Sequence, residues 1–198
     1  MSREMTLSQA AFGTGGLARN AMLVLAGSAF IAVAAQISVP MFPVPMTLQT
    51  LAILMVGFAY GSRLGAATLL AYLAEGAMGL PVFANAMNGA AFAGPTAGFL
   101  LGFVAMAWAA GLAAERGLAR GLVGTALSAL LISAALYIPG LAWPALIAGG
   151  FGIGGGWIAQ EASFYWAHFM APFLLGDVVK TVIVALMVTS GWKALSRS

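Results

Sequence analysis

The sequence contains no cysteine, a single histidine and very few charged residues. Only 7% of its 198 residues are Asp, Glu, Lys or Arg, against about 25% in an ordinary soluble domain. Without cysteine the chain can form no disulfide, no thiolate nucleophile and no cysteine-based metal site. His168 is far from any carboxylate motif, and no acids are paired at a useful spacing. We therefore expect no enzyme, no cofactor and no metal centre.

Apolar residues take the place of the missing charges. They make up 62% of the chain, and the mean hydropathy is +1.01. These values are typical of an integral membrane protein, so the lipid bilayer is a predicted partner. The 8 basic residues are scattered and form no run, which argues against a nucleic-acid partner.

Apolar runs near the length of a bilayer crossing predict an all-α protein with six transmembrane helices. The runs are 21–39, 47–60, 64–79, 95–114, 121–143 and 169–192. The second and third runs are short and separated only by residues 61–63, so one long re-entrant element is the alternative. Gly61 and Arg63 favour two helices. We expect one substrate-binding domain over 1–198, with 1–19 as a cytoplasmic segment.

Basic residues predict the orientation of these helices, because cytoplasmic loops of membrane proteins are enriched in Lys and Arg. With both termini in the cytoplasm, the basic residues outside the last helix all fall on the cytoplasmic side. They are Arg3, Arg19, Arg63, Arg116, Arg120, Lys193 and Arg197. The alternative is a secretory signal cleaved near 32–34, but losing the first helix would put the remaining loops in conflict with this rule.

The predicted outer loops are apolar and rich in Pro and Gly. Segments 40–45 and 79–94 carry no charge, unlike solvated loops. We expect them to fold back as caps over the protein, since irregular backbone is tolerated at membrane depth only against protein or a cavity. Simple helix-ending punctuation is the alternative. The Gly-rich run 149–156 lacks the Lys-Ser/Thr of a phosphate-binding loop and is expected to be a flexible or close-packing segment.

An acid and a base lie inside the last apolar run. Asp177 and Lys180 are three positions apart, which places them on one face of a helix. An ionisable side chain at the centre of a membrane helix costs about 2.5 to 3.5 kcal/mol and usually has a function. The pair therefore predicts a ligand site, and a self-neutralising ion pair is the alternative.

Several sequence blocks together resemble the BioY family, the substrate-binding S components of energy-coupling-factor biotin transporters. The blocks occur in order from about residue 20 to the C-terminus, and they are 36–40, 43–50, 79–83, 94–103 and 172–180. One departure is Thr96-Ala97-Gly98-Phe99, where the family has Thr-Gly-Gly-Tyr, so position 99 offers no hydroxyl.

The resemblance implies biotin as the ligand and assigns roles to individual residues. Lys180 is expected to neutralise the biotin carboxylate, Asp177 to accept a urea N–H, and Asn85 to bind the urea from its loop. The remaining contacts are expected in a mostly apolar pocket. They are Phe83, Tyr72, Phe99, Thr47 and Gln49.

The resemblance also implies partners, because the chain has no ATPase motif of its own. They are a transmembrane coupling protein and two cytoplasmic ATPases in a bacterial cytoplasmic membrane. Ser28 with Ala32 would form the small-residue docking face of the first helix. Assembly with further copies of the same chain stays open. The alternative functions are an S component for another small vitamin and a structural subunit of a membrane complex.

Overall fold

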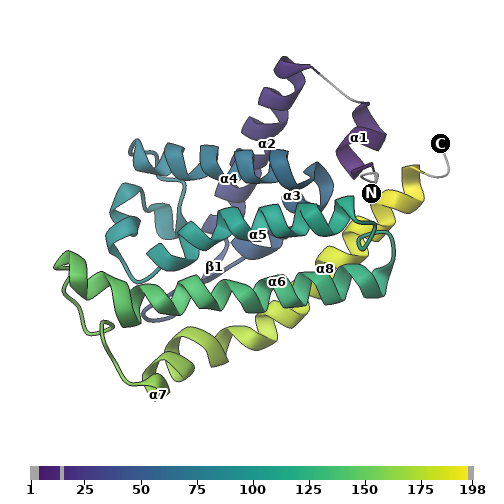
Figure 1. Ribbon diagram of the computed structural model, residues 1–198. Coiled ribbons are helices and arrows are strands. Elements are labelled where there is room, and N and C mark those ends of the chain that lie inside the picture. The colour runs from purple at the N-terminus through teal and green to yellow at the C-terminus, as the bar shows by residue number, and fades with distance from the viewer. Residues whose placement is uncertain (1–4, 14–15, 196–198) are drawn as a thin grey trace.

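The computed structural model describes residues 5–13 and 16–195, and helices dominate it (Figure 1). The predicted basic residues Arg3 and Arg197 lie outside this part of the chain. The α-helices are α1 (Leu7–Phe12), α2 (Leu17–Gln36), α3 (Gln49–Tyr60), α4 (Ser62–Ala77), α5 (Ala97–Glu115), α6 (Leu122–Ala142), α7 (Ala162–Tyr165) and α8 (Ala171–Leu195). Shorter helical turns are η1 (Ala84–Ala86), η2 (Gly89–Ala93), η3 (Trp143–Ile147), η4 (Ala148–Phe151) and η5 (Trp166–Met170).

Within residues 5–13 and 16–195, four helical stretches are long and apolar enough to cross a membrane. They are Leu17–Gln36, Ala97–Glu115, Leu122–Phe151 and Ala162–Leu195. The second and third predicted spans correspond to α3 and α4, with 12 and 16 residues, which is short of the roughly twenty that a crossing needs. They are nevertheless two helices and not one re-entrant element, because the chain turns sharply at Gly61 (φ 86°).

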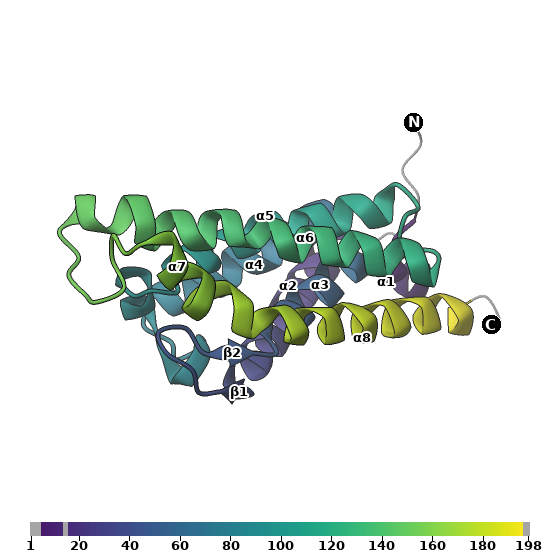
Figure 2. The ribbon, with the colours of Figure 1, turned by 90° about the horizontal axis from the view of Figure 1, so that it is seen from below.

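The central helix of the fold is α5, which packs against α3, α4 and α6. Glycines let the helices approach closely. A Cβ on Gly111 would lie 2.2 Å from the carbonyl carbon of Gly61 and the nitrogen of Ser62. A Cβ on Gly98 would lie 2.2 Å from the carbonyl oxygen of Pro139. Figure 2 shows α8 running alongside α6.

A buried carboxylate fixes the α3–α4 turn to the end of α5. Glu115, which is 8% exposed, accepts hydrogen bonds at Oε1 from the Ser62 backbone N–H and hydroxyl, both at 2.8 Å. Ser62 is the first residue of α4, where backbone N–H groups have no partner within the helix. The negative charge therefore satisfies and stabilises the α4 N-terminus.

We expect Glu115→Ala to lower the free energy of unfolding by about 2 kcal/mol, because it leaves the buried Ser62 N–H without this acceptor. Thermal unfolding of the purified protein in detergent would measure the loss. Glu115→Gln keeps one acceptor oxygen, so its free energy of unfolding should lie between those of the wild-type protein and Glu115→Ala. Glu161→Ala is the matched control, since Glu161 is exposed and its side chain makes no cap hydrogen bond. Equal unfolding temperatures for Glu115→Ala and the control would contradict this role.

The same end of the molecule gathers basic residues and both ends of the described chain (Figure 1). Arg116 and Arg120 lie in the α5–α6 turn, and Arg63 follows the turn that Glu115 holds. The Arg120 guanidinium lies 3.7 Å from the centroid of the Trp192 ring in the last turns of α8, next to Lys193. The clustering agrees with the charge distribution on which the predicted orientation rests.

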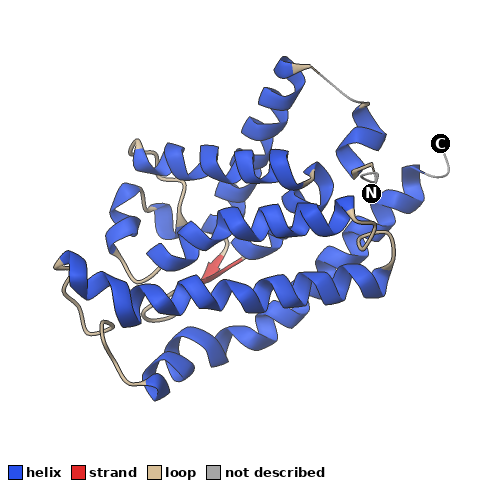
Figure 3. Ribbon diagram, viewed as in Figure 1, coloured by secondary structure: helices blue, strands red, loops and turns tan. Residues whose placement is uncertain are grey.

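The opposite end contains structure that the sequence did not predict. A two-stranded antiparallel sheet joins β1 (Ser38–Val39) to β2 (Met46–Thr47) and closes the loop between them (Figure 3). The fold class is all-helical, as predicted, and this sheet of two-residue strands is a local feature of one loop in the described part of the chain. The helices on either side of the loop 152–161 also continue past their predicted limits. The first extends through η3 and η4 to Phe151, and the second begins at Ala162. A helical stretch of 30 residues is roughly 45 Å long and exceeds the 30 Å hydrocarbon core.

The predicted docking residues are not on a free surface. Ser28 is fully buried, and its hydroxyl hydrogen-bonds the carboxylate of Glu75 on α4. Ala32 is half-buried and packs against the main core. A Cβ on the neighbouring Gly27 would lie 2.8 Å from Thr68 of α4. The small-residue face of α2 is therefore used for packing within the chain, because it lets α4 approach closely. The buried Ser28 cannot meet a partner directly, which corrects that part of the docking prediction, whereas a docking role for the half-buried Ala32 stays a prediction.

Candidate functional site

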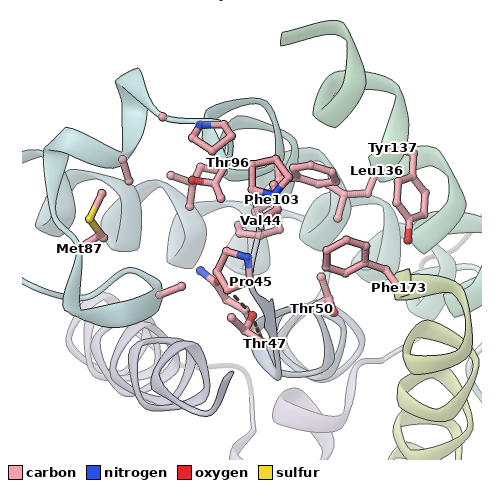
Figure 4. A pocket seen from close by; sticks show the side chains of 18 of the residues that line it. Val44, Pro45, Thr47, Thr50, Met87, Thr96, Phe103, Leu136, Tyr137 and Phe173 are labelled. Atoms are coloured by element: carbon pink, nitrogen blue, oxygen red, sulfur yellow. Dashed lines mark hydrogen bonds between the residues drawn. The ribbon is translucent and has the colours of Figure 1, made fainter. Parts of the chain in front are cut away.

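A cavity of about 240 Å³ lies beneath the loops at the end opposite the basic cluster (Figure 4). Its walls come from α3, α5, α6, α8 and both predicted capping loops. The lining residues include Pro43, Val44, Pro45, Thr47, Gln49, Thr50, Asn85, Met87, Thr96, Phe99, Phe103, Leu136, Tyr137, Phe173, Asp177 and Lys180. The loops thus cover a cavity, as the prediction of caps required.

One end of the cavity holds a buried polar cluster around Asp177. Its Oδ1 lies 3.5 Å from Lys180 Nζ, and its Oδ2 accepts a hydrogen bond of 2.6 Å from the Tyr137 hydroxyl. Lys180 is 7% exposed and donates to Thr50 Oγ1 at 3.1 Å. Three helices supply these groups. The cluster offers donors and acceptors side by side in an apolar setting, where hydrogen bonds are stronger than in water.

The pairing changes how Asp177 and Lys180 can meet a ligand. From the sequence, Lys180 was expected to bind the carboxylate of biotin and Asp177 its urea, which are separate parts of one molecule. Because their charged groups lie 3.5 Å apart, both face the same part of any bound molecule. A ligand carboxylate at Lys180 would also lie close to the Asp177 carboxylate and be repelled by it.

The other end of the cavity is formed by the loop that carries Asn85 and Met87, both exposed. In Figure 4 Met87 lies at the left of the view and Tyr137 at the right. Ser38 Oγ donates to Asn85 Oδ1 at 3.3 Å. Since the side-chain oxygen is engaged, the Asn85 amide NH₂ is the group left to donate to a ligand.

Thr47 and Gln49 lie on the cavity wall between these ends. Gln49 is buried and donates through Nε2 to the Tyr72 hydroxyl at 2.7 Å. Its backbone N–H donates to Thr47 Oγ1 at 3.1 Å. Both side chains are thus partly committed to the protein, and Thr47 Oγ1 satisfies the first backbone N–H of α3.

Tyr72 and Phe83 do not line the cavity, which corrects the prediction that they contact the ligand. Both rings are essentially inaccessible, at 0% and 1% exposed, and they meet edge to face with centroids 5.3 Å apart. The Tyr72 hydroxyl donates to the Val82 carbonyl at 2.9 Å. The two rings lie behind the wall because they anchor the Asn85 loop to α4, where Gly76 leaves room for Phe83.

Aromatic side chains provide the rest of the wall. Phe99 lines the cavity as predicted and meets Tyr137 edge to face, with centroids 6.1 Å apart. Phe103 and Phe173 line it from α5 and α8 (Figure 4). A mostly apolar wall with a few placed polar groups is the usual form of a small-molecule site.

Tyr137 and Thr50 are site residues that the sequence analysis missed. Tyr137 is an isolated tyrosine in an apolar run, and Thr50 ends one of the five sequence blocks. Neither stands out locally. The relevant signal was a hydroxyl inside a predicted span, which needs a partner when it is buried.

Comparison with known proteins identifies the family of the chain. The profile of the BioY family matches residues 2–197. The chain belongs to the BioY family. The biotin transporter BioY of Rhodobacter capsulatus is 37% identical over 163 residues, which cover 74% of this chain and 77% of that protein. The probable biotin transporter BioY of Pyrococcus horikoshii is 34% identical over 173 residues, covering 86% and 94%.

A solved structure has the same fold. The crystal structure of the S-component for biotin from an ECF-type ABC transporter superposes with a TM-score of 0.67, covering 91% of this chain and 95% of that chain at 21% identity. At this identity the likeness concerns the fold alone. Three of the blocks that resemble the BioY family, 43–50, 94–103 and 172–180, supply much of the cavity wall.

Proposed function

We propose that this chain binds biotin in the cavity and acts as the substrate-binding subunit of an energy-coupling-factor transporter for biotin uptake. The observation that carries the proposal is the buried Asp177–Lys180 pair on the wall of a covered cavity in a member of the BioY family. The names of the relatives support biotin as the substrate.

The buried polar cluster is suited to the urea of biotin. A cyclic urea has two N–H donors and one acceptor oxygen, and it is neutral. Asp177 can accept an N–H while Lys180 donates to the urea oxygen, so both charges gain a hydrogen-bond partner and remain paired with each other. Phe99, Phe103 and Phe173 then surround the fused rings. Burying a neutral group beside this pair adds no net charge to an apolar region.

The exposed end of the cavity is suited to the carboxylate. Burying that charge next to Asp177 would be costly, whereas a position near the exposed Asn85 keeps it close to water. The Asn85 NH₂ donates to it in this orientation. The reverse orientation, with the carboxylate at Lys180 as expected from the sequence, is the second candidate, because Lys180 is the only Lys or Arg among the described residues that line the cavity.

Binding of biotin and its carboxylate-masked amide to the purified protein tests the function and the orientation. With the urea at Asp177 and Lys180, biotin binds and the amide binds within about fivefold of it, since a solvated ion contact contributes little. With the carboxylate at Lys180, the amide binds more than about thirtyfold more weakly than biotin, which is the effect of removing one side of a buried charge pair. No binding of biotin at micromolar concentration would contradict the function and favour another vitamin or a structural role.

The proposed topology has six membrane crossings, with both termini in the cytoplasm of a bacterium. The clustering of basic residues near Glu115 supports it. Energy would come from a transmembrane coupling protein and two ATPases. Since Ser28 is buried against α4, the exposed small residues of α2 that remain for close approach are Ala18, Ala21, Ala26 and Ala29. Transport assays in cells with and without the ATPases would test this dependence and the alternative of a self-sufficient homo-oligomer.

A further inference from the structure

The side chain of Gln36 holds the loop that carries Asn85. Gln36 is the last residue of α2 and belongs to the first of the five sequence blocks, yet it does not line the cavity. Its Nε2 donates to the Phe83 carbonyl at 3.0 Å, and its Oε1 accepts from the Ala86 N–H at 3.0 Å. One side-chain amide therefore joins the residues on both sides of the Ala84–Asn85 pair.

The loop between these two hydrogen bonds has an unfavourable backbone. Asn85 has φ 58° and Ala86 has φ 55°, in the left-handed region that residues with a Cβ seldom adopt. Asparagine tolerates this conformation, but alanine has no polar side chain with which to compensate for it. Two such residues in succession persist only where the surroundings hold them. The hydrogen bonds to Gln36 hold Ala86 itself and, on the other side of Asn85, Phe83.

This conformation decides where the Asn85 side chain points. Phe83 is buried and fixes the start of the loop, and its N–H donates to the Met87 carbonyl at 2.9 Å. Ala86 is exposed, so packing does not fix it. If its N–H were released, the backbone on either side of it could relax to negative φ and turn the Asn85 amide away from the cavity.

We propose that Gln36 is a positioning residue that holds Asn85 in its ligand-binding conformation. This inference rests on the proposed function. The plainer reading is that Gln36 only ends α2, because its Nε2 also lies 3.2 Å from the Ala32 carbonyl of its own helix. The two readings differ in whether the effect of removing Gln36 depends on Asn85.

The first measurement needs no ligand. In the free protein, Gln36→Ala should accelerate amide hydrogen exchange in a peptide covering 84–87, while exchange in 108–114 of α5 stays unchanged. Gln36→Glu keeps the acceptor for the Ala86 N–H but loses the donor to Phe83. Its exchange rate in 84–87 should therefore lie between those of the wild-type protein and Gln36→Ala. Gln160→Ala, at an exposed glutamine of the loop 152–161, is the matched control. Unchanged exchange in 84–87 would overturn the proposal whether or not the protein binds biotin.

The second measurement is a double-mutant cycle on biotin affinity. Gln36→Ala alone should weaken binding by roughly fivefold to tenfold, as expected for two partly exposed hydrogen bonds. The same change should have no further effect in an Asn85→Ala background and its full effect in a Lys180→Ala background. Equal effects in both backgrounds would overturn the positioning role and leave biotin binding intact. Failure of the wild-type protein to bind biotin would overturn the function, and the exchange measurement would still decide the inference.

Discussion

Replacing Lys180 by alanine is expected to weaken biotin binding by about 2 to 5 kcal/mol, the range for removing one partner of a buried charge pair. Lys180 is buried, lies 3.5 Å from Asp177 and donates to Thr50. Its loss removes a donor to the ligand and leaves the Asp177 charge uncompensated in an apolar region. Calorimetric titration of the purified variant with biotin would measure the effect.

Two further variants make this result specific. Lys193→Ala removes a cation from the same helix at the basic end of the molecule, and binding should not change. Asp177→Asn keeps the shape of the side chain and removes its charge. A ligand role predicts lower affinity with normal membrane insertion, whereas a purely internal ion pair predicts an unstable protein because Lys180 is left unpaired. If Lys180→Ala bound biotin as wild type does, the pair would not be the binding site.

Gly111→Ala is expected to lower the free energy of unfolding by about 3 kcal/mol, the upper end of the usual cost of overpacking. A Cβ at this position would lie 2.2 Å from backbone atoms of Gly61 and Ser62. Neither backbone atom can move aside as a flexible side chain would, so α5 and the α3–α4 turn must separate. That separation would also disturb the hydrogen bonds from Ser62 to Glu115.

Thermal unfolding in detergent would measure the effect of Gly111→Ala. Gly150→Ala is the matched control, because a Cβ on Gly150 meets nothing within 4 Å. We expect the control to unfold at the wild-type temperature. A variant at Gly111 that is as stable as the control would show that the helices do not approach each other as closely as the structure has them.

Much of the site was predictable from the sequence because charges are rare in apolar surroundings. Asp177 and Lys180 stood out for that reason, and both line the cavity together with Asn85, Phe99, Thr47 and Gln49. Their ligand contacts stay predictions. Tyr72 and Phe83 were predicted on the cavity wall but pack behind it. A buried aromatic ring gives the same local signal in the sequence in either place.

The docking prediction was wrong for Ser28 for a related reason. Small residues at Ser28 and Ala32 permit close helix approach, but a pattern on one helix does not say which helix approaches. In the structure α4 occupies that face, and Glu75 accepts the hydrogen bond of Ser28. The exposed face of α2 could be identified only after this contact was known.

Composition and apolar run length by themselves determined that the chain is helical and suited to a membrane, and the order of its sequence blocks indicated its family. These properties follow from the solvent around the chain, and each can be deduced from one segment at a time. Only the tertiary structure decided which side chains share the cavity. The contact of Tyr137 with Asp177 joins residues 40 positions apart, and that of Thr50 with Lys180 joins residues 130 positions apart. Such pairs form when helices pack, because the register between two helices depends on all the side chains at their interface.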